Sequence, residues 1–243
     1  MSRLHEDKQL SKTPCTLPEA LVEAESRNAS LGARLAAYRD STLRIRPDIA
    51  KAYDDLVARL DMLDSGAIGP QVGQPLPEFT LPDENGRLVS LSSLLLTGPA
   101  VISLNRGHWC PYCKLELRSL GAIHDEIRQL RARLVSIMPD TATFTDDYVK
   151  QNRLPFPILS DMDLGYALSL GLVFWVGAEI QRLYRDLGIE LERYQGNRGC
   201  FLPMGAKFIV GQDGLIKARQ VNIEFRERME PAAVLAVLRE LRS

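Results

Sequence analysis

The chain has 243 residues, of which 45% are hydrophobic and 25% are charged, and its formal net charge is -1. Such a balance offers no basic field to nucleic acid or to anionic lipid, so neither is an expected partner. A chain of this length can bury a large core without covalent cross-links, which leaves its 4 cysteines free for chemistry.

The N-terminal sequence MSRLHEDKQLSKTP is polar and lacks the apolar core of a signal peptide. No later run approaches the roughly 18 apolar residues of a membrane span. We therefore expect a cytoplasmic protein with no membrane partner. In that compartment two neighbouring cysteines stay reducible, which favours a catalytic or metal-binding pair over a permanent disulfide.

Apolar or small residues recur with helical spacing over the first 65 residues. One stripe runs from Leu17 to Ile45, and a second runs from Ile49 to Leu63 and stops at the Asp-Ser-Gly of residues 64–66. These helices can pack on the neighbouring domain or pair with a second copy as a homodimer, and we favour packing. The pattern predicts a helical N-terminal extension over residues 1–68.

A segment dense in Gly and Pro, residues 66–79, marks a boundary, and strand and helix patterns alternate beyond it. AVISLN (100–105) and LVSIMP (134–139) read as strands, with a helical pattern between them. This order predicts a parallel strand pair with a right-handed crossover. Further elements complete an α/β domain over residues 72–243: a strand at FPIL (156–159), a hairpin over 207–221 and a final helix at PAAVLAVLREL.

The stretch RGHWCPYC places Cys110 and Cys113 where the first of these strands gives way to the helix. Free N–H groups and the positive end of the helix dipole stabilise a thiolate at such a position. We therefore expect Cys110 to be the attacking thiolate and the more acidic and more exposed thiol, and Cys113 to be the resolving thiol. A structural zinc site would need a second ligand pair, and the other candidates are scattered: His5, His108, His124, Cys15 and Cys200. We expect no bound metal.

Four segments together resemble the alkyl hydroperoxide reductase/thiol-specific antioxidant (peroxiredoxin-like) family: VGQPLPEFTLPDENGRLVSLSSLL, NRGHWCPYCKLEL, FPILSD and KFIVGQDGLIKA. The likeness extends over about residues 72 to 242, and WCPYC also looks like the active site of thioredoxin and glutaredoxin. The resemblance implies a thioredoxin-like fold, with a central mixed sheet flanked by helices. It also implies reduction of a peroxide or a disulfide through cysteine, without a cofactor.

The chain departs from the family's pattern at several positions. Ser103 and Gly107 stand seven and three residues before Cys110, where typical peroxiredoxins carry Pro and Thr. Gly205 stands where a thioredoxin fold places a cis-proline opposite the cysteines. Because glycine gives no steric cover, we expect a wider groove there, open to a bulky hydroperoxide or a metal, or else a glycine that only allows a turn.

Three residues beside the cysteines are further candidates for the site. Arg106 can stabilise the Cys110 thiolate and polarise a peroxide oxygen, or it can form a surface ion pair. His108 can relay a proton to the leaving thiolate, and Trp109 can cover the dithiol and offer a docking surface. The charged cluster of residues 224–230 receives no chemical role, and the insertion of residues 176–199 shapes a substrate groove or caps the sheet.

The preferred hypothesis is a thiol-dependent antioxidant enzyme that reduces hydroperoxides, with a thioredoxin, glutaredoxin or glutathione-type thiol as reductant. The alternative is a thiol-disulfide oxidoreductase that attacks a protein or glutathione disulfide, which the missing Pro and Thr favour. A third hypothesis is a binding module in which the cysteine pairs of two chains hold an iron-sulfur cluster or a metal.

Overall fold

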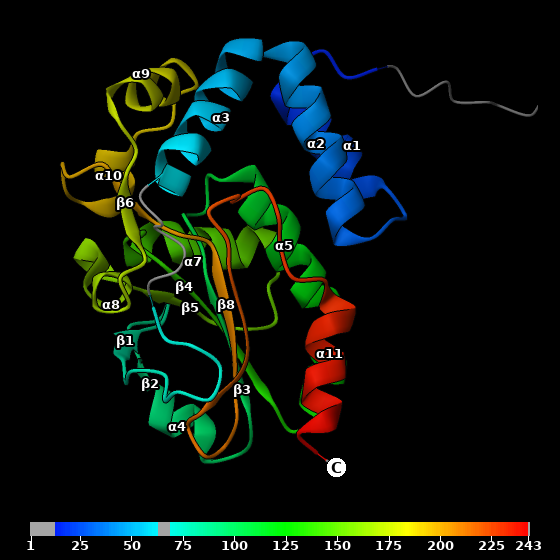
Figure 1. Cartoon of the computed structure of the whole chain (residues 1–243), viewed down its shortest axis with the longest axis vertical. Helices are drawn as coiled ribbons and strands as arrows, with labels where there is room; N and C mark the ends of the chain where they lie inside the picture. Colours follow the sequence, from blue (N-terminus) through cyan, green and yellow to red (C-terminus); the bar gives the residue numbers. More distant parts are fainter. Residues whose placement is uncertain (1–12, 63–68, 243) are drawn as a thin grey trace, which may run out of the picture.

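A five-stranded mixed sheet lies at the centre of the protein in the computed structural model, which describes residues 13–62 and 69–242 (Figure 1). The strands run in the order β5-β4-β3-β8-β9, with β3, β4 and β5 parallel and β8 and β9 antiparallel to their neighbours. Their bounds are β3 Ala100–Leu104, β4 Arg133–Met138, β5 Ile158–Ser160, β8 Ala206–Val210 and β9 Ile216–Val221. Every residue of β3 and β8 is buried, as expected for central strands covered on both faces.

The predicted crossover between β3 and β4 is confirmed. It consists of α5 (Pro111–Ala122) and α6 (His124–Gln129), and α11 (Pro231–Glu240) packs beside α6 on the same face of the sheet (Figure 1). Pro111 is the first residue of α5, a position where its missing N–H costs no hydrogen bond. The crossover thus places Cys110 at the carboxyl end of β3, immediately before a helix N-terminus.

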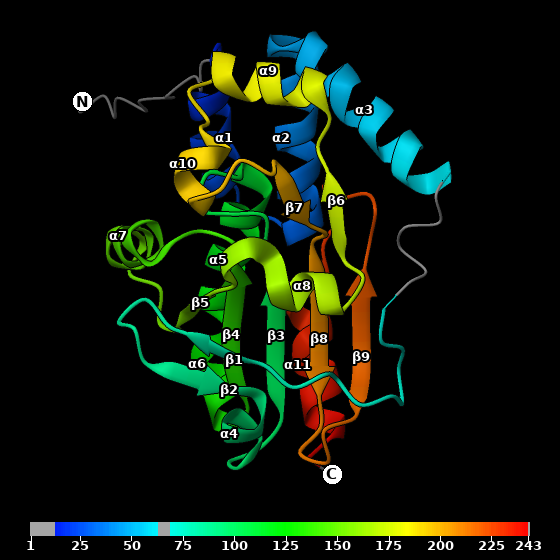
Figure 2. The same cartoon turned by 90° about the vertical axis from the view of Figure 1, so that its left-hand side faces the viewer.

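The opposite face of the sheet carries smaller elements, which Figure 2 shows in front of the strands. These are β1 (Thr80–Pro82), β2 (Leu88–Ser90), α4 (Leu91–Leu95), a 3-10 turn (Met162–Leu164) and α8 (Gly165–Ser169). At the edge, α7 (Ala142–Asn152) packs near β5. A second small sheet pairs β6 (Val173–Trp175) with β7 (Phe201–Pro203), and the insertion between them folds as α9 (Ala178–Asp186) and α10 (Leu191–Gln195).

The predicted helical extension is confirmed over the described residues, but its first stripe is two helices rather than one. The three helices are α1 (Leu17–Ser26), α2 (Leu31–Ile45) and α3 (Pro47–Met62). The chain leaves α1 at Arg27, and Ser30 starts α2 by accepting a hydrogen bond from the backbone N–H of Ala33. The predicted end of the second stripe and much of the predicted boundary fall on residues 63–68, outside the described part of the chain.

The extension packs on the sheet domain, as favoured from the sequence. Its helices lie at the end of the sheet where β3 leads into α5, and buried side chains of α1, α2 and α3 share one hydrophobic cluster with those of β3 and α5 (Figure 1). Glu230, just before α11, accepts hydrogen bonds from the N–H groups of Leu31 (3.1 Å) and Gly32 (2.7 Å) at the start of α2. The homodimer alternative stays a prediction. Over the described residues, every helix is too short or too polar to span a lipid bilayer.

Candidate active site

Cys110 and Cys113 occupy the N-terminus of α5, one helical turn apart. Cys110 is the residue that caps the helix, and both sulfur atoms are free thiols. Each cysteine has an exposed fraction of 0%, so the expectation that Cys110 is the more exposed thiol is wrong. The reason is tertiary: α2 packs on α5, and the rings of Tyr38 and Phe225 lie 5.2 and 5.7 Å from that of Tyr112, beside the dithiol.

Arg106 lies beside the first thiol. Its Nη2 donates a hydrogen bond to Cys110 Sγ at 3.1 Å, and its guanidinium carbon lies 3.7 Å from the ring centroid of Phe225. The side chain is buried, and its Nε and Nη1 atoms have no hydrogen-bond partner among the described residues. Since no described carboxylate pairs with it, the predicted surface ion pair is wrong, and the charge of Arg106 acts on the sulfur.

The two thiols differ in acidity in the predicted direction. Burial is the largest influence on Cys110 and opposes its ionisation, but hydrogen bonds from Cys113 and the charge of Arg106 hold its pKa well below the usual value. Burial and the hydrogen bond to Cys110 raise the pKa of Cys113 well above its usual value. These directions favour the thiolate at Cys110 and the protonated thiol at Cys113.

A buried ionic cluster lies beside the second thiol, and no sequence pattern indicates it. Glu116, one turn after Cys113 on α5, bonds Lys207 Nζ of β8 through one carboxylate oxygen and Arg228 Nε through the other, each at 2.8 Å. Arg228 Nη2 lies 4.0 Å from Cys113 Sγ. The side chains of Glu116, Lys207 and Arg228 are all nearly inaccessible, so their charges act on one another and on the dithiol with little solvent screening.

Gly205 has a different role from either one expected. A Cβ at this position would lie 2.7 Å from the guanidinium carbon of Arg228, so the absence of a side chain makes room for the arginine. The wide groove predicted from the missing proline is wrong, because Arg228 fills that space. Gly205 has no positive φ and lies in an extended link between β7 and β8 rather than in a turn, so the turn alternative is also wrong. No peptide bond in the described part of the chain is cis.

The two other departures from the family pattern are packed rather than open. Ser103 is buried on β3, and its Oγ accepts a hydrogen bond from Asn105 Nδ2 at 3.0 Å. Gly107 has φ of 143°, and a side chain there would collide with the indole ring of Trp109. Threonine therefore does not fit at position 107, since both its backbone angle and its neighbour exclude a Cβ.

The contacts of His108 and Trp109 do not support the proton relay and the docking surface predicted for them. His108 Nδ1 lies 2.9 Å from Asp140 Oδ2, and its ring stacks on Phe144; none of the interactions found among the described residues joins it to a thiol. Trp109 is buried, with its ring centroid 5.0 Å from that of Tyr184 on α9. The docking surface predicted at Trp109 is wrong, because α9 covers the ring.

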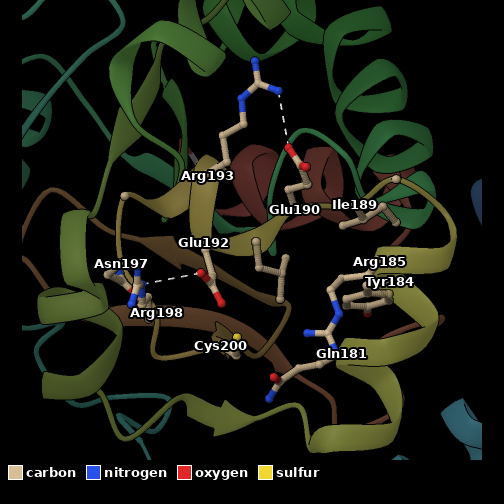
Figure 3. A pocket seen from close by; sticks show the side chains of 13 residues that line it. Gln181, Tyr184, Arg185, Ile189, Glu190, Glu192, Arg193, Asn197, Arg198 and Cys200 are labelled. Atoms are coloured by element: carbon tan, nitrogen blue, oxygen red, sulfur yellow. Dashed lines mark hydrogen bonds and ion pairs between the residues drawn. The ribbon is translucent and has the colours of Figure 1, made fainter.

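None of the interactions found among the described residues joins the other two cysteines to the dithiol. Cys200 borders a cavity of about 700 Å³ lined by α9, α10 and the loop that follows, which Figure 3 shows from close by. Burial, followed by the charge of Glu192, raises the pKa of Cys200. Cys15 is exposed near the N-terminus of α1. Within the described ranges, no group of three or more His, Cys, Asp or Glu side chains is placed to hold a metal ion.

Relatives by sequence are peroxiredoxins. A peroxiredoxin-type protein of Mycobacterium tuberculosis is 28% identical over 102 residues, which cover 42% of this chain and 66% of that protein. The chain thus matches just under two thirds of that relative's length. Peroxiredoxin Q, chloroplastic, of Triticum aestivum is 27% identical over 157 residues, covering 62% of this chain and 72% of the relative.

Solved structures show the same fold. The crystal structure of Peroxidoxin BcpB from Mycobacterium tuberculosis has a TM-score of 0.56 and 22% identity, and covers 72% of this chain and 99% of its own. Reduced Prx3 from Vibrio vulnificus, in complex with H2O2, has a TM-score of 0.53 and 17% identity, with coverage of 69% and 98%. The profile of the AhpC/TSA family matches residues 72–219, more than half of the sequence. The chain belongs to the AhpC/TSA family and has the thioredoxin fold of the peroxiredoxins.

Proposed function

We propose that this protein is a thiol-dependent peroxidase whose reacting atom is Cys110 Sγ. One observation carries the proposal: the buried guanidinium of Arg106, which has no carboxylate partner among the described residues, donates to that sulfur at 3.1 Å. A lone cation at this distance stabilises a thiolate, which is the nucleophile in peroxide reduction. The chain belongs to the AhpC/TSA family and its relatives by sequence are named peroxiredoxins, which supports the same chemistry.

In the first step the Cys110 thiolate attacks one oxygen of a hydroperoxide. The S–O bond forms as the O–O bond breaks, so the sulfur is oxidised to a sulfenic acid and the peroxide is reduced. The leaving oxygen takes up a proton and departs as an alcohol, or as water when the substrate is hydrogen peroxide. Arg106 Nε and Nη1, which have no partner among the described residues, are the donors available to the negative charge on that oxygen.

In the second step Cys113 condenses with the sulfenic acid. An S–S bond forms between the two cysteines and water leaves, which closes the ring of a CxxC disulfide across the first turn of α5. An external thiol then reduces the disulfide in two exchange steps and restores both cysteines. A thioredoxin, glutaredoxin or glutathione-type thiol supplies these electrons, and we propose a cytoplasmic location because that compartment maintains such reductants.

Burial of the dithiol bears on the substrate. Both sulfur atoms have an exposed fraction of 0%, so an oxidant reaches Cys110 only when neighbouring side chains move. A small hydroperoxide needs a smaller movement than a branched one or a protein disulfide. We therefore propose hydrogen peroxide or a small organic hydroperoxide as the substrate.

The second candidate is a thiol-disulfide oxidoreductase. The specific observation that favours it is the absence of a hydroxyl group at position 107, where typical peroxiredoxins carry Thr and where this chain has no room for one. Burial argues against a protein disulfide as the substrate but admits a small one. The same pair of sulfur atoms would serve both reactions.

The two candidates are separated by stopped-flow kinetics of the reduced protein in excess over oxidant. We expect hydrogen peroxide to be consumed at least about tenfold faster than glutathione disulfide. The lowered pKa of Cys110 supplies the thiolate that attacks the peroxide, and the Arg106 donors stabilise the oxygen that leaves. A faster reaction with the disulfide would assign the protein to the oxidoreductases. Bound iron or zinc in the purified protein would instead support the metal-binding alternative.

A further inference from the structure

Arg228 makes three separate contacts, and the mechanism above uses none of them. Its Nε donates to Glu116 Oε2 at 2.8 Å, its Nη1 donates to the backbone carbonyl of Glu227 at 2.9 Å, and its Nη2 faces Cys113 Sγ at 4.0 Å. The side chain has an exposed fraction of only 3%. A guanidinium held by two acceptors has a fixed position, so its third edge is directed at the sulfur.

Gly205, which is distant from Arg228 in the sequence, makes room for its side chain. Gly205 leaves free the space in which the guanidinium lies, since any Cβ there would meet its carbon and both terminal nitrogens within 2.8 Å. The backbone of Gly205 is not in the region reserved for glycine, so its conformation does not require this residue. The requirement at position 205 is therefore the space taken by Arg228.

One excess positive charge lies beside each cysteine of the dithiol, although only one of the two sulfur atoms is negative at a time. Glu116 bonds both Lys207 and Arg228, and its single negative charge leaves one positive charge in excess beside Cys113. Arg106 supplies a second positive charge beside Cys110. The reduced site holds one thiolate, on Cys110, so one of the two excess charges has no anionic partner in that state.

We propose, on the basis of the peroxidase function above, that Arg228 is a catalytic residue of the second step, in which it stabilises the thiolate of Cys113 after Cys110 has been oxidised. In the reduced protein burial raises the pKa of Cys113, and the hydrogen bond to Cys110 and its negative charge raise it further. Oxidation converts Cys110 to an uncharged sulfenic acid and removes that repulsion. The positive charge of Arg228 then favours the negative form of the sulfur 4.0 Å away.

The step balances without a further reactant. Cys113 loses its proton, and the resulting thiolate attacks the sulfur of the Cys110 sulfenic acid. The S–S bond forms as the S–O bond breaks, and the hydroxide that leaves combines with the released proton as water. Arg106 therefore stabilises the thiolate of Cys110, and Arg228 stabilises that of Cys113. Cys113 ionises second, because the negative charge of Cys110 must first be removed by oxidation.

The test separates the two chemical steps in Arg228→Met, which removes the charge and keeps an unbranched chain. One equivalent of hydrogen peroxide is mixed with the reduced protein, peroxide consumption reports the first step, and disulfide formation and dimedone capture report the second. We expect consumption within about threefold of the parent and disulfide formation at least about tenfold slower, the effect of about one pKa unit on the thiolate fraction of Cys113. Arg228→Lys, which retains a cation, should recover part of the second rate.

Arg226→Met is the matched control, since Arg226 is also a buried arginine of this segment but pairs with Glu224 and Asp54 instead of a thiol. It should leave disulfide formation at the parent rate. If Arg228→Met does not fold, Gly205→Ala displaces the guanidinium without removing it and should slow the second step in the same way.

The possible failures are distinguishable. Disulfide formation at the parent rate in folded Arg228→Met, or an equal loss of both steps, would overturn the role of Arg228 while leaving the peroxidase intact. A parent protein that does not consume peroxide would instead overturn the proposed function. A steeper rise of disulfide formation with pH in Arg228→Met than in the parent is also expected, since a thiol without its cation ionises at higher pH.

Discussion

The dithiol and Cys200 place the same functional group in opposite surroundings. Both sulfur atoms of the dithiol are closed to solvent, whereas Cys200 borders a cavity of about 700 Å³ (Figure 3). Guanidinium groups face Cys110 and Cys113, at 3.1 and 4.0 Å. Beside Cys200 the opposite charges pair with each other, as Arg193 does with Glu190 at 3.3 Å.

Charge, and not open space, decides where thiol chemistry is expected in this protein. The pKa of Cys110 is lowered although the residue is completely buried, because hydrogen bonds from Cys113 and the charges of Arg106 and Arg228 outweigh the cost of burial. The pKa of Cys200 is raised, because burial and the negative charge of Glu192 outweigh the positive charge of Arg185. A search for a well-formed cavity would thus select Cys200 and pass over the dithiol.

The largest expected effect is on turnover, and it distinguishes the cysteines of the dithiol from Cys200. Cys110→Ser should lose peroxide reduction completely, and Cys113→Ser should consume one equivalent of peroxide and stop at a sulfenic acid that dimedone captures. Cys200→Ser should retain the parent turnover. Peroxide consumption is measured without reductant for Cys113→Ser, since dithiothreitol itself reduces a sulfenic acid, and with dithiothreitol for the parent and the other variants. Loss of activity in Cys200→Ser equal to that in Cys110→Ser would show that Cys200, rather than Cys113, is the resolving residue.

The second effect concerns the cation that distinguishes the two sites. Arg106→Met removes the charge 3.1 Å from Cys110 Sγ, so the pKa of Cys110 should rise and less thiolate should be present at neutral pH. We expect peroxide consumption at pH 7 to fall at least about tenfold, which corresponds to about one pKa unit. The midpoint of the pH–rate profile should move to higher pH. Exposed Arg239, paired with Glu126 on the protein surface, provides the control, and an unshifted midpoint in Arg106→Met would contradict the assignment.

Local patterns were sufficient to predict the elements that carry the dithiol. The apolar run of residues 100–104 predicts a buried strand, and Pro111 after Cys110 predicts the helix start, because both signals depend on residues close in sequence. The break between α1 and α2 was missed although it has a local signal. Ser30 is a favourable N-cap, but small and apolar residues keep the same spacing across it and concealed the break.

The ionic half of the site could not be predicted, since its contacts join distant parts of the chain. Arg228 bonds Glu116 across 112 positions, and it fills the space above Gly205. A glycine in a sequence indicates freedom of conformation and says nothing about which side chain lies against it. Only Glu116 has a local signal: it is a carboxylate between Leu115 and Leu117 on a buried stretch of helix.

A third prediction tests whether the helical extension restricts access to the dithiol. Tyr38 of α2 is buried and meets Tyr112 edge to face at 5.2 Å, above the start of α5. Tyr38→Ala should destabilise the protein by about 3 kcal/mol, the usual cost of removing a buried aromatic ring. It should also raise the rate at which a bulky maleimide alkylates Cys110, measured against the small reagent iodoacetamide. An unchanged ratio of the two rates would show that the extension does not restrict access.

The smallest expected effect is the order in which Cys110 and Cys200 are alkylated, because each of them has a different advantage. Cys200 has the advantage of the adjoining cavity, and Cys110 has the advantage of a lowered pKa, so that it retains thiolate at mildly acidic pH, where Cys200 is protonated. The thiolate is the reacting form, so iodoacetamide should label Cys110 first at that pH in a Cys15→Ser background. The lead should shrink as the pH rises and Cys200 ionises. Mass spectrometry of the labelled peptides gives the order. Faster labelling of Cys200 at acidic pH would mean that access outweighs ionisation, and faster labelling of Cys113 would reverse the roles within the dithiol.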